Sequence, residues 1–165
     1  MDKATAQKTL APLVREIGYR MRTTAPQSGM SMPPWAGEMC TRVAVALGDE
    51  SIVLVTGTLD AELSGFLAVF TPTRLIKATT FSASGLVEIA VKAIGRRDLK
   101  SVSVQGGTDI FSSKMGLEWP GPITVSATYP DDELSLSSDG FGEGSVAERE
   151  FLAFIPSLLE DLARD

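Results

Sequence analysis

Residues 51–80 read SIVLVTGTLDAELSGFLAVFTPTRLIKATT and hold the pattern that decides the fold. Two apolar, β-branched runs, residues 52–59 and 65–70, are separated by a short polar turn, and a third run begins at Arg74. Val, Ile, Phe and Thr favour strands, whereas Pro72 ends one because it has no N–H for the next ladder bond. The stretch therefore predicts three antiparallel strands joined in sequence order. Such a meander needs another layer to bury one of its faces.

The strand pattern continues downstream. Residues 86–94 (LVEIAVKAI) alternate apolar and polar side chains, as do residues 99–105 and 123–129, and shorter runs lie at residues 108–112 and 134–136. Alternation with a period of two is typical of a half-buried strand. Together with the opening meander, these runs predict seven or eight short strands, which is the number found in a small barrel or sandwich.

Amphipathic helices are predicted on both sides of the strands. Residues 9–22 carry apolar side chains at helical spacing, with Thr9 as the expected N-cap. Residues 145–162 open with a capping box, Ser145 to Glu148, and continue with a wide apolar face. The first helix either lies on an anionic membrane or packs on the domain or on a second copy. We expect packing, because its apolar face has no Trp or Phe.

The segment between the first helix and the strands predicts the domain organisation. Residues 23–34 (TTAPQSGMSMPP) carry no charge and are rich in Pro, Ser and Thr, which is typical of a connector. Residues 35–47 match both a helix and a strand; we predict a helix, because the helical match is longer and two prolines directly before it suit a helix start. We therefore expect an amphipathic helix with a flexible linker over residues 1–34, and the main domain over residues 35–165.

Composition excludes several classes of function. The 165 residues include no histidine and one cysteine, and the net charge of −6 is uneven: residues 1–42 hold six Lys or Arg against three Asp or Glu, and residues 131–165 hold two against ten. An acidic end repels phosphate backbones, so nucleic acid is not an expected partner. Without histidine, the commonest general base and zinc ligand are missing, so we expect no metal, no cofactor and no enzymatic activity. Without an export signal or a membrane-length apolar run, we expect a cytoplasmic protein.

The order of these elements resembles the bacterial pleckstrin-homology (PH)-like domains, over residues 37–165. The resemblance is carried by GFLAVFTPTRLI and by the later runs VEIAVKAI and REFLAFIPSLLEDL. In the first run, the residues that match are Gly65, Leu67, Phe70, Thr71, Arg74, Leu75 and Ile76. The resemblance implies a mainly β (β+α) fold: a bent antiparallel barrel of about seven strands capped by a C-terminal helix, here with an additional N-terminal helix.

The same resemblance implies a non-catalytic binding or scaffold module whose partner is another protein or a second copy of the chain. Lipid-binding relatives carry clustered Lys and Arg in the first hairpin loop. Here residues 60–64 hold two acids and no base, so we do not expect phosphoinositide or membrane binding. An alternative function is a small-molecule carrier, with an apolar ligand inside the barrel.

Four cations form the candidate ligand-binding group: Lys92, Arg96, Arg97 and Lys100. Such a group can hold a phosphate or a carboxylate, or the acidic head of a carried ligand. It can also be an ordinary solvated turn, which is the interpretation we favour. Arg74 is expected to serve the structure, because its fork of donors can hold neighbouring carbonyls or an acid at a strand start.

Overall fold

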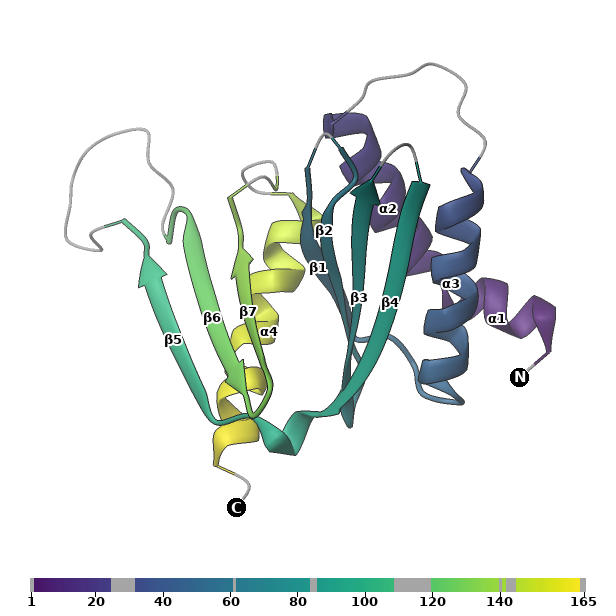
Figure 1. The fold of residues 1–165 in the computed structure, drawn as a ribbon. Coiled ribbons are helices and arrows are strands. Elements are labelled where there is room, and N and C mark those ends of the chain that lie inside the picture. Colours follow the sequence, from purple (N-terminus) through teal and green to yellow (C-terminus); the bar gives the residue numbers. More distant parts are fainter. Residues whose placement is uncertain are drawn as a thin grey trace. The chain divides into compact units, whose positions relative to one another are not determined.

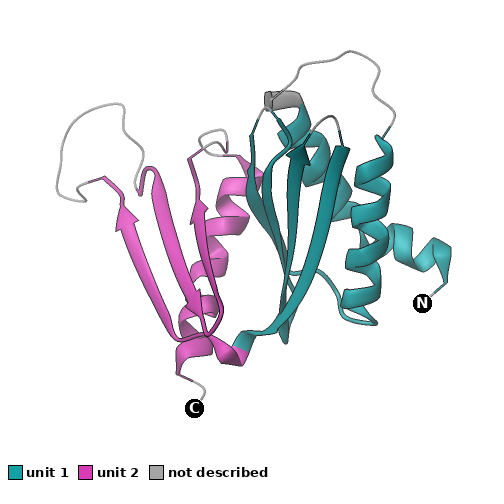
Figure 2. Ribbon diagram, in the orientation of Figure 1, with its two compact units in different colours: residues 1–96 teal, residues 97–165 magenta. Residues whose placement is uncertain are grey.

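The computed structural model describes residues 2–24, 32–60, 62–83, 86–108, 120–139, 141 and 145–163. The chain divides into two compact units, residues 1–96 (unit 1) and residues 97–165 (unit 2), shown in two colours in Figure 2. The N-terminal helices belong to the same unit as the first four strands. The two units join along the chain between residues 96 and 97, and the boundary predicted between residues 34 and 35 stays a prediction.

Unit 1 consists of a four-stranded sheet and helices (Figure 1). Its helices are α1 (Lys3–Thr9), α2 (Ala11–Thr24) and α3 (Pro34–Leu47), and its strands are β1 (Leu54–Leu59), β2 (Gly65–Phe70), β3 (Arg74–Ala83) and β4 (Leu86–Gly95). The strands pair antiparallel in sequence order, β1-β2-β3-β4. This confirms the predicted meander, including the strand at residues 65–70 and the strand start at Arg74.

Two glycines allow β1 and β2 to lie close together. A Cβ atom at Gly57 would lie 2.2 Å from the carbonyl oxygen of Phe66, and one at Gly65 would lie 2.1 Å from that of Thr58. Both glycines also have positive φ angles, +150° and +145°, which side chains disfavour. Neither position therefore accepts another residue without separating the two strands.

The apolar core of unit 1 lies between the helices and one face of its sheet. Leu13 of α2 and Met39 and Val43 of α3 have no exposed surface, and Ile17 has 1%. The strands contribute Val55, Leu67, Val69, Ile76, Ala78 and Ile89 to the same cluster. These strand residues share one face, as the register requires. The helix predicted at residues 35–47 is confirmed as α3, and the alternative strand is wrong.

The N-terminal segment forms two helices, so the prediction of one helix capped by Thr9 is wrong. Asp2 is the true N-cap: its carboxylate accepts hydrogen bonds from the backbone N–H (3.0 Å) and the hydroxyl (2.8 Å) of Thr5. Thr9 is the last residue of α1, and Pro12 lies in the first turn of α2, where its missing N–H costs no bond.

Unit 2 is a three-stranded antiparallel sheet followed by one helix. Its elements are β5 (Ser101–Gly106), β6 (Ile123–Tyr129), β7 (Asp132–Ser137) and α4 (Val146–Leu162), and the strands pair in the order β5-β6-β7. The short 3-10 helix η1 (Arg96–Asp98) lies between β4 and β5. Most of the strand predicted at residues 108–112 lies outside the described residues.

The predicted C-terminal helix and its N-cap are confirmed. Ser145 is its N-cap and accepts a hydrogen bond from the backbone N–H of Glu148 (3.1 Å). Phe151, Phe154 and Leu158 are buried, and the ring of Phe151 lies 5.9 Å from that of Phe141, centroid to centroid. The helix also contacts β5 of its own unit.

The fold is therefore mixed β and α: two antiparallel sheets, of four and three strands, with N-terminal helices and a C-terminal helix. The described residues form seven strands, where seven or eight were predicted. Strand pairing among the described residues leaves both sheets open and closes no barrel. None of the described helices has the length and apolar composition needed to cross a bilayer.

Candidate functional site

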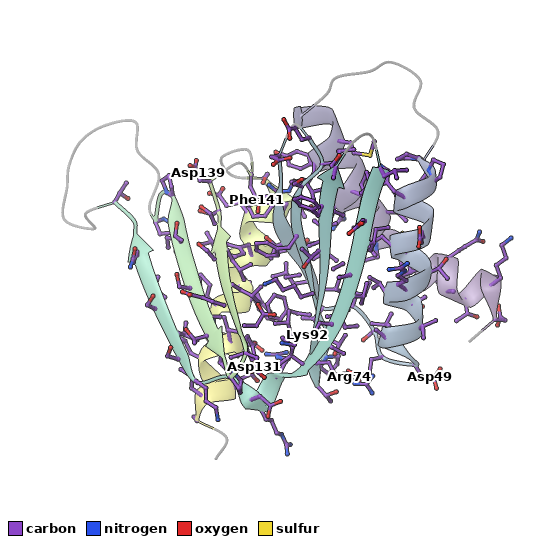
Figure 3. The ribbon with its side chains drawn as sticks, in the orientation of Figure 1. Asp49, Arg74, Lys92, Asp131, Asp139 and Phe141 are labelled. Atoms are coloured by element: carbon purple, nitrogen blue, oxygen red, sulfur yellow. The ribbon has the colours of Figure 1, made fainter. Side chains whose placement is uncertain are left out.

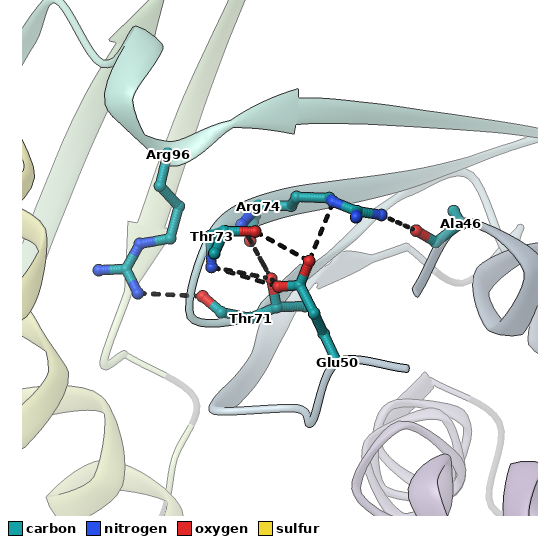
Figure 4. A network of polar contacts seen from close by, with 6 residues as sticks. All are labelled: Ala46, Glu50, Thr71, Thr73, Arg74 and Arg96. Carbon is teal, nitrogen blue, oxygen red and sulfur yellow. Dashed lines mark hydrogen bonds and ion pairs between the residues drawn. The ribbon is translucent and has the colours of Figure 1, made fainter. Parts of the chain in front are cut away.

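The four predicted cations differ in their surroundings. Arg96 is 5% exposed, and its Nη1 donates a hydrogen bond to the carbonyl of Thr71 (3.0 Å; Figure 4). Nη1 thus binds the main chain, and for Arg96 a role in ligand binding also stays a prediction. Lys92 is exposed on β4 (Figure 3), whereas Arg97 and Lys100 are exposed in unit 2. For these three residues, a role in ligand binding stays a prediction.

Glu50 organises the turn between β2 and β3 (Figure 4). One oxygen of its carboxylate, Oε1, accepts a hydrogen bond from the hydroxyl of Thr73 (2.8 Å) and forms an ion pair with Nε of Arg74 (3.0 Å). The other oxygen, Oε2, accepts from the hydroxyl of Thr71 and from the backbone N–H of Thr73 (3.2 Å). A single carboxylate therefore satisfies four donors of this turn.

These contacts determine the protonation of Glu50. Partial burial disfavours the charged form and acts to raise the pKa. The hydrogen bonds from Thr71 and Thr73 and the charge of Arg74 act in the opposite direction and prevail, so the pKa of Glu50 lies below its ordinary value. Both carboxylate oxygens bind donors of the turn, so Glu50 stabilises the structure and is not a ligand site.

The prediction for Arg74 is confirmed. Besides its ion pair with Glu50, its Nη1 donates a hydrogen bond to the carbonyl of Ala46 at the end of α3 (3.0 Å). Arg74 thus ties the start of β3 to α3. Sequence reasoning missed Glu50 because 21 residues separate it from Thr71, and no local pattern pairs the two.

The free edge of β4 offers main-chain groups to a partner. β4 is an outer strand and, within the described residues, pairs with β3 along one side only. In an antiparallel pair, successive residues direct N–H and C=O alternately toward the partner strand and away from it. The N–H of Arg96 donates to the carbonyl of Thr73 (2.9 Å), so even-numbered residues of β4 bond to β3 and odd-numbered residues point outward. The outward residues are Val87, Ile89, Val91 and Ala93.

A contact from α3 agrees with this assignment. Nη1 of Arg42 donates a hydrogen bond to the carbonyl of Ile89, one of the outward residues. Arg42 also forms an ion pair with Glu38 one turn earlier on the helix. Side chains that cover an edge strand in this way reduce its tendency to pair with other chains. Arg42 therefore covers one point along the β4 edge.

The side chains beside this edge are exposed and include charges of both signs. Leu86 is 73% exposed, and Glu88, Ala90 and Lys92 follow it on the sheet face that points away from the helices. Lys92 lies directly opposite Lys77 of β3.

Unit 2 has a second exposed edge at β5. Five of the six residues of β5 are exposed, and Val104 keeps 49% of its surface. The N–H of Gly107 donates to the carbonyl of Pro122 (2.8 Å), so the even-numbered residues of β5 point to its outer side. Sheet edges with exposed main-chain groups are sites where extended peptides add a strand.

A groove of about 1020 Å³ lies among α1, α2 and α3 of unit 1. Leu10, Val14, Cys40 and Val45 line its apolar part, and Lys3 and Asp49 are its charged lining residues. Cys40 is buried, and this burial raises the pKa of its thiol, which favours the neutral form. The volume is that of a site for a small molecule.

The described residues hold no group of three or more metal-ligating side chains. Comparison of the chain with family models, curated protein sequences and solved structures found no match. The case for function therefore rests on the geometry described above.

Proposed function

We propose that the chain is a cytoplasmic, non-catalytic interaction module of PH-like build that binds an extended protein segment along an open sheet edge. One observation carries the proposal: β4 directs the N–H and C=O groups of every second residue to an edge that is covered by Arg42 at one carbonyl. An added strand would gain main-chain hydrogen bonds there, and exposed side chains such as Leu86 would supply specificity.

The PH-like part of the proposal is supported by the order of elements. A four-stranded meander, a three-stranded meander and a C-terminal helix follow one another along the chain. The bent barrel itself stays part of the proposal. The acidic first hairpin loop, with Asp60 and Glu62, disfavours a phosphate ligand.

A selection from displayed random peptides tests the proposal. Peptides that bind the full chain should adopt an extended conformation, and their binding should be lost in the Val91→Pro variant. Val91 directs its N–H outward, so proline at this position removes an edge donor without removing a bond to β3. Glu62→Ala, in the exposed loop before β2, is the control and should bind normally. Peptides that bind the proline variant equally well would contradict the proposal.

A small-molecule carrier is the second candidate, and the groove in unit 1 favours it. The ligand would lie among α1, α2 and α3, which differs from the barrel interior expected from the sequence. Native mass spectrometry of freshly purified chain should then show retained ligand, and Val45→Arg should abolish it. Val45 is 80% exposed, so the variant should fold normally while a charge enters the apolar lining. A spectrum without extra mass would argue against a carrier.

A further inference from the structure

We propose that the β4 edge pairs with β4 of a second copy, antiparallel, about a two-fold axis at Ala90. This inference rests on the proposed function and names the partner for one edge: the chain itself. The two sheets would become one continuous eight-stranded sheet across the dimer, built from the four strands of unit 1 in each copy. A two-fold axis makes every contact occur twice, so a self-complementary edge is the requirement.

The direction of the main-chain groups restricts the register. Odd-numbered residues of β4 point outward, so hydrogen bonds between the two copies must join odd residues to odd residues. With the axis at Ala90, Ile89 bonds Val91 of the second copy, and Val87 bonds Ala93. Even residues then face one another without hydrogen bonds, and in such pairs the side chains approach most closely, with Cα atoms about 4.5 Å apart.

Charge selects one register among those that remain. Glu88 and Lys92 are the two charged residues of β4, and both are exposed on the same face. An axis at Ala90 places Glu88 opposite Lys92 of the second copy, twice. An axis at Glu88 or at Lys92 would place like charges opposite each other, and an axis at Ile89 or Val91 would leave both charges opposite uncharged residues. The register at Ala90 is thus the one that pairs opposite charges.

The remaining side chains fit this register. Leu86, 73% exposed in the single chain, would face Ile94 of the second copy and gain an apolar neighbour. Ala90 lies at the axis itself, where two copies of one side chain meet at the shortest separation and a small residue fits.

Arg42 is the residue that competes with this pairing. In the dimer, the carbonyl of Ile89 accepts a hydrogen bond from the N–H of Val91 of the second copy, and this is the carbonyl that Arg42 occupies in the single chain. The side chain of Arg42 is 46% exposed, so it has room to withdraw toward Glu38, to which it is already bonded. Removing Arg42 should therefore strengthen the dimer.

Sedimentation velocity of the full chain over a range of concentrations tests the proposal. The chain of 17.5 kDa should form a species of twice that mass. Glu88→Lys and Lys92→Glu should each weaken dimerisation by about ten- to hundredfold, because each creates two pairs of like charge. The double variant should dimerise normally, and an equal mixture of the two single variants should form a heterodimer. Arg42→Ala should tighten the dimer, and Glu62→Ala is the control.

The outcomes distinguish failure of the dimer proposal from failure of the proposed peptide-binding function. A chain that stays monomeric at millimolar concentration, while selected peptides still bind at the edge blocked by Val91→Pro, overturns the dimer and leaves the interaction module in place. A dimer that the charge exchanges do not change overturns this register. A monomer that also binds no peptide overturns both. Circular dichroism of every variant shows whether the fold is kept.

Discussion

Units 1 and 2 are both antiparallel meanders with helices, yet they differ in how they are stabilised. Unit 1 has two strands of ten residues, β3 and β4, and three helices, whereas the strands of unit 2 have six or seven residues and one helix follows them. Unit 1 holds ten Lys or Arg against eight Asp or Glu, a net charge of +2; unit 2 holds five against thirteen, a net charge of −8. The same topology thus occurs once with a nearly balanced surface and once with a strongly acidic one.

The difference shows that strand order alone does not determine what stabilises a meander. In unit 1, a large apolar cluster is combined with a turn in which Glu50 and Arg96 bind main-chain and hydroxyl groups. In unit 2, buried residues of α4 contribute the apolar packing, while the thirteen acids repel one another. Substitutions in the two units should therefore have separable effects.

The largest effect is expected in the two apolar cores. Leu13→Ala should lower the free energy of unfolding by about 2–5 kcal/mol, because Leu13 has no exposed surface and leaves a cavity. Phe151→Ala, in unit 2, should cost about 3–5 kcal/mol for the same reason. Val14→Ala is the matched control on α2 and should cost less than about 1 kcal/mol, because Val14 is 38% exposed. Urea denaturation measures all three, and equal costs at Leu13 and Val14 would refute the assigned core.

The next effect concerns Glu50, in the turn between β2 and β3 of unit 1. Glu50→Ala should cost about 2–3 kcal/mol, because hydrogen bonds to a charged group are lost at several donors together. The pKa of Glu50 in the folded state lies below its ordinary value of 4.5, so its contribution is present above that pH and is lost as the pH falls through the folded-state pKa.

Thermal unfolding at several pH values tests this linkage. Between about pH 5 and about pH 3, the wild-type chain should lose more stability than Glu50→Gln, which cannot titrate at this position. Parallel pH profiles for the two proteins would show that the turn does not depend on the charge of Glu50.

A smaller effect is expected at the two adjacent arginines at the chain boundary between the units, Arg96 and Arg97. Arg96→Ala should cost about 1.5–2 kcal/mol, because the carbonyl of Thr71 loses a charged donor. Arg97→Ala should change stability by less than about 0.5 kcal/mol, because its side chain is exposed. Chemical denaturation of the pair separates a structural arginine from a surface one. A larger cost at Arg97 would reverse the assignment.

The smallest effect concerns the start of α4. Ser145→Ala should cost about 1 kcal/mol, because the backbone N–H of Glu148 loses its cap. Ser103→Ala on exposed β5 is a matched control with little expected change. If unit 2 unfolds separately, the shift should appear in its transition alone, measured by the fluorescence of a probe attached to this unit.

Most helices and strands could be predicted from the sequence because their signals lie within a few neighbouring residues. The strand at residues 65–70 begins with a glycine and is followed by a proline-containing turn, and α3 starts at a pair of prolines. In both elements, the apolar pattern and the residues at the ends indicate the same structure. The helix α1 was missed because its seven residues have no apolar face. Its cap, Asp2 three residues before Thr5, was a signal that could have revealed it.

The candidate site depends on contacts that the sequence does not display. Arg74 was assigned correctly because a fork of donors at a strand start has neighbours to bind in any meander. Arg96 was grouped with three exposed cations, and its burial follows from the turn at Thr71, 25 residues earlier. The role of Arg42 at the β4 edge depends on Ile89, 47 residues later. Contacts between residues so far apart in the sequence arise from tertiary packing, so no local sequence pattern predicts them.

The meander topology also determines how the chain can reach its structure. Every strand pairs with its neighbour in sequence, β1 to β4 in one sheet and β5 to β7 in the other, so each loop to be closed is short. The first sheet needs no residue beyond Gly95, so it can form while unit 2 is still being synthesised. Unit 1 can thus fold during translation, before the acidic unit 2 has been synthesised.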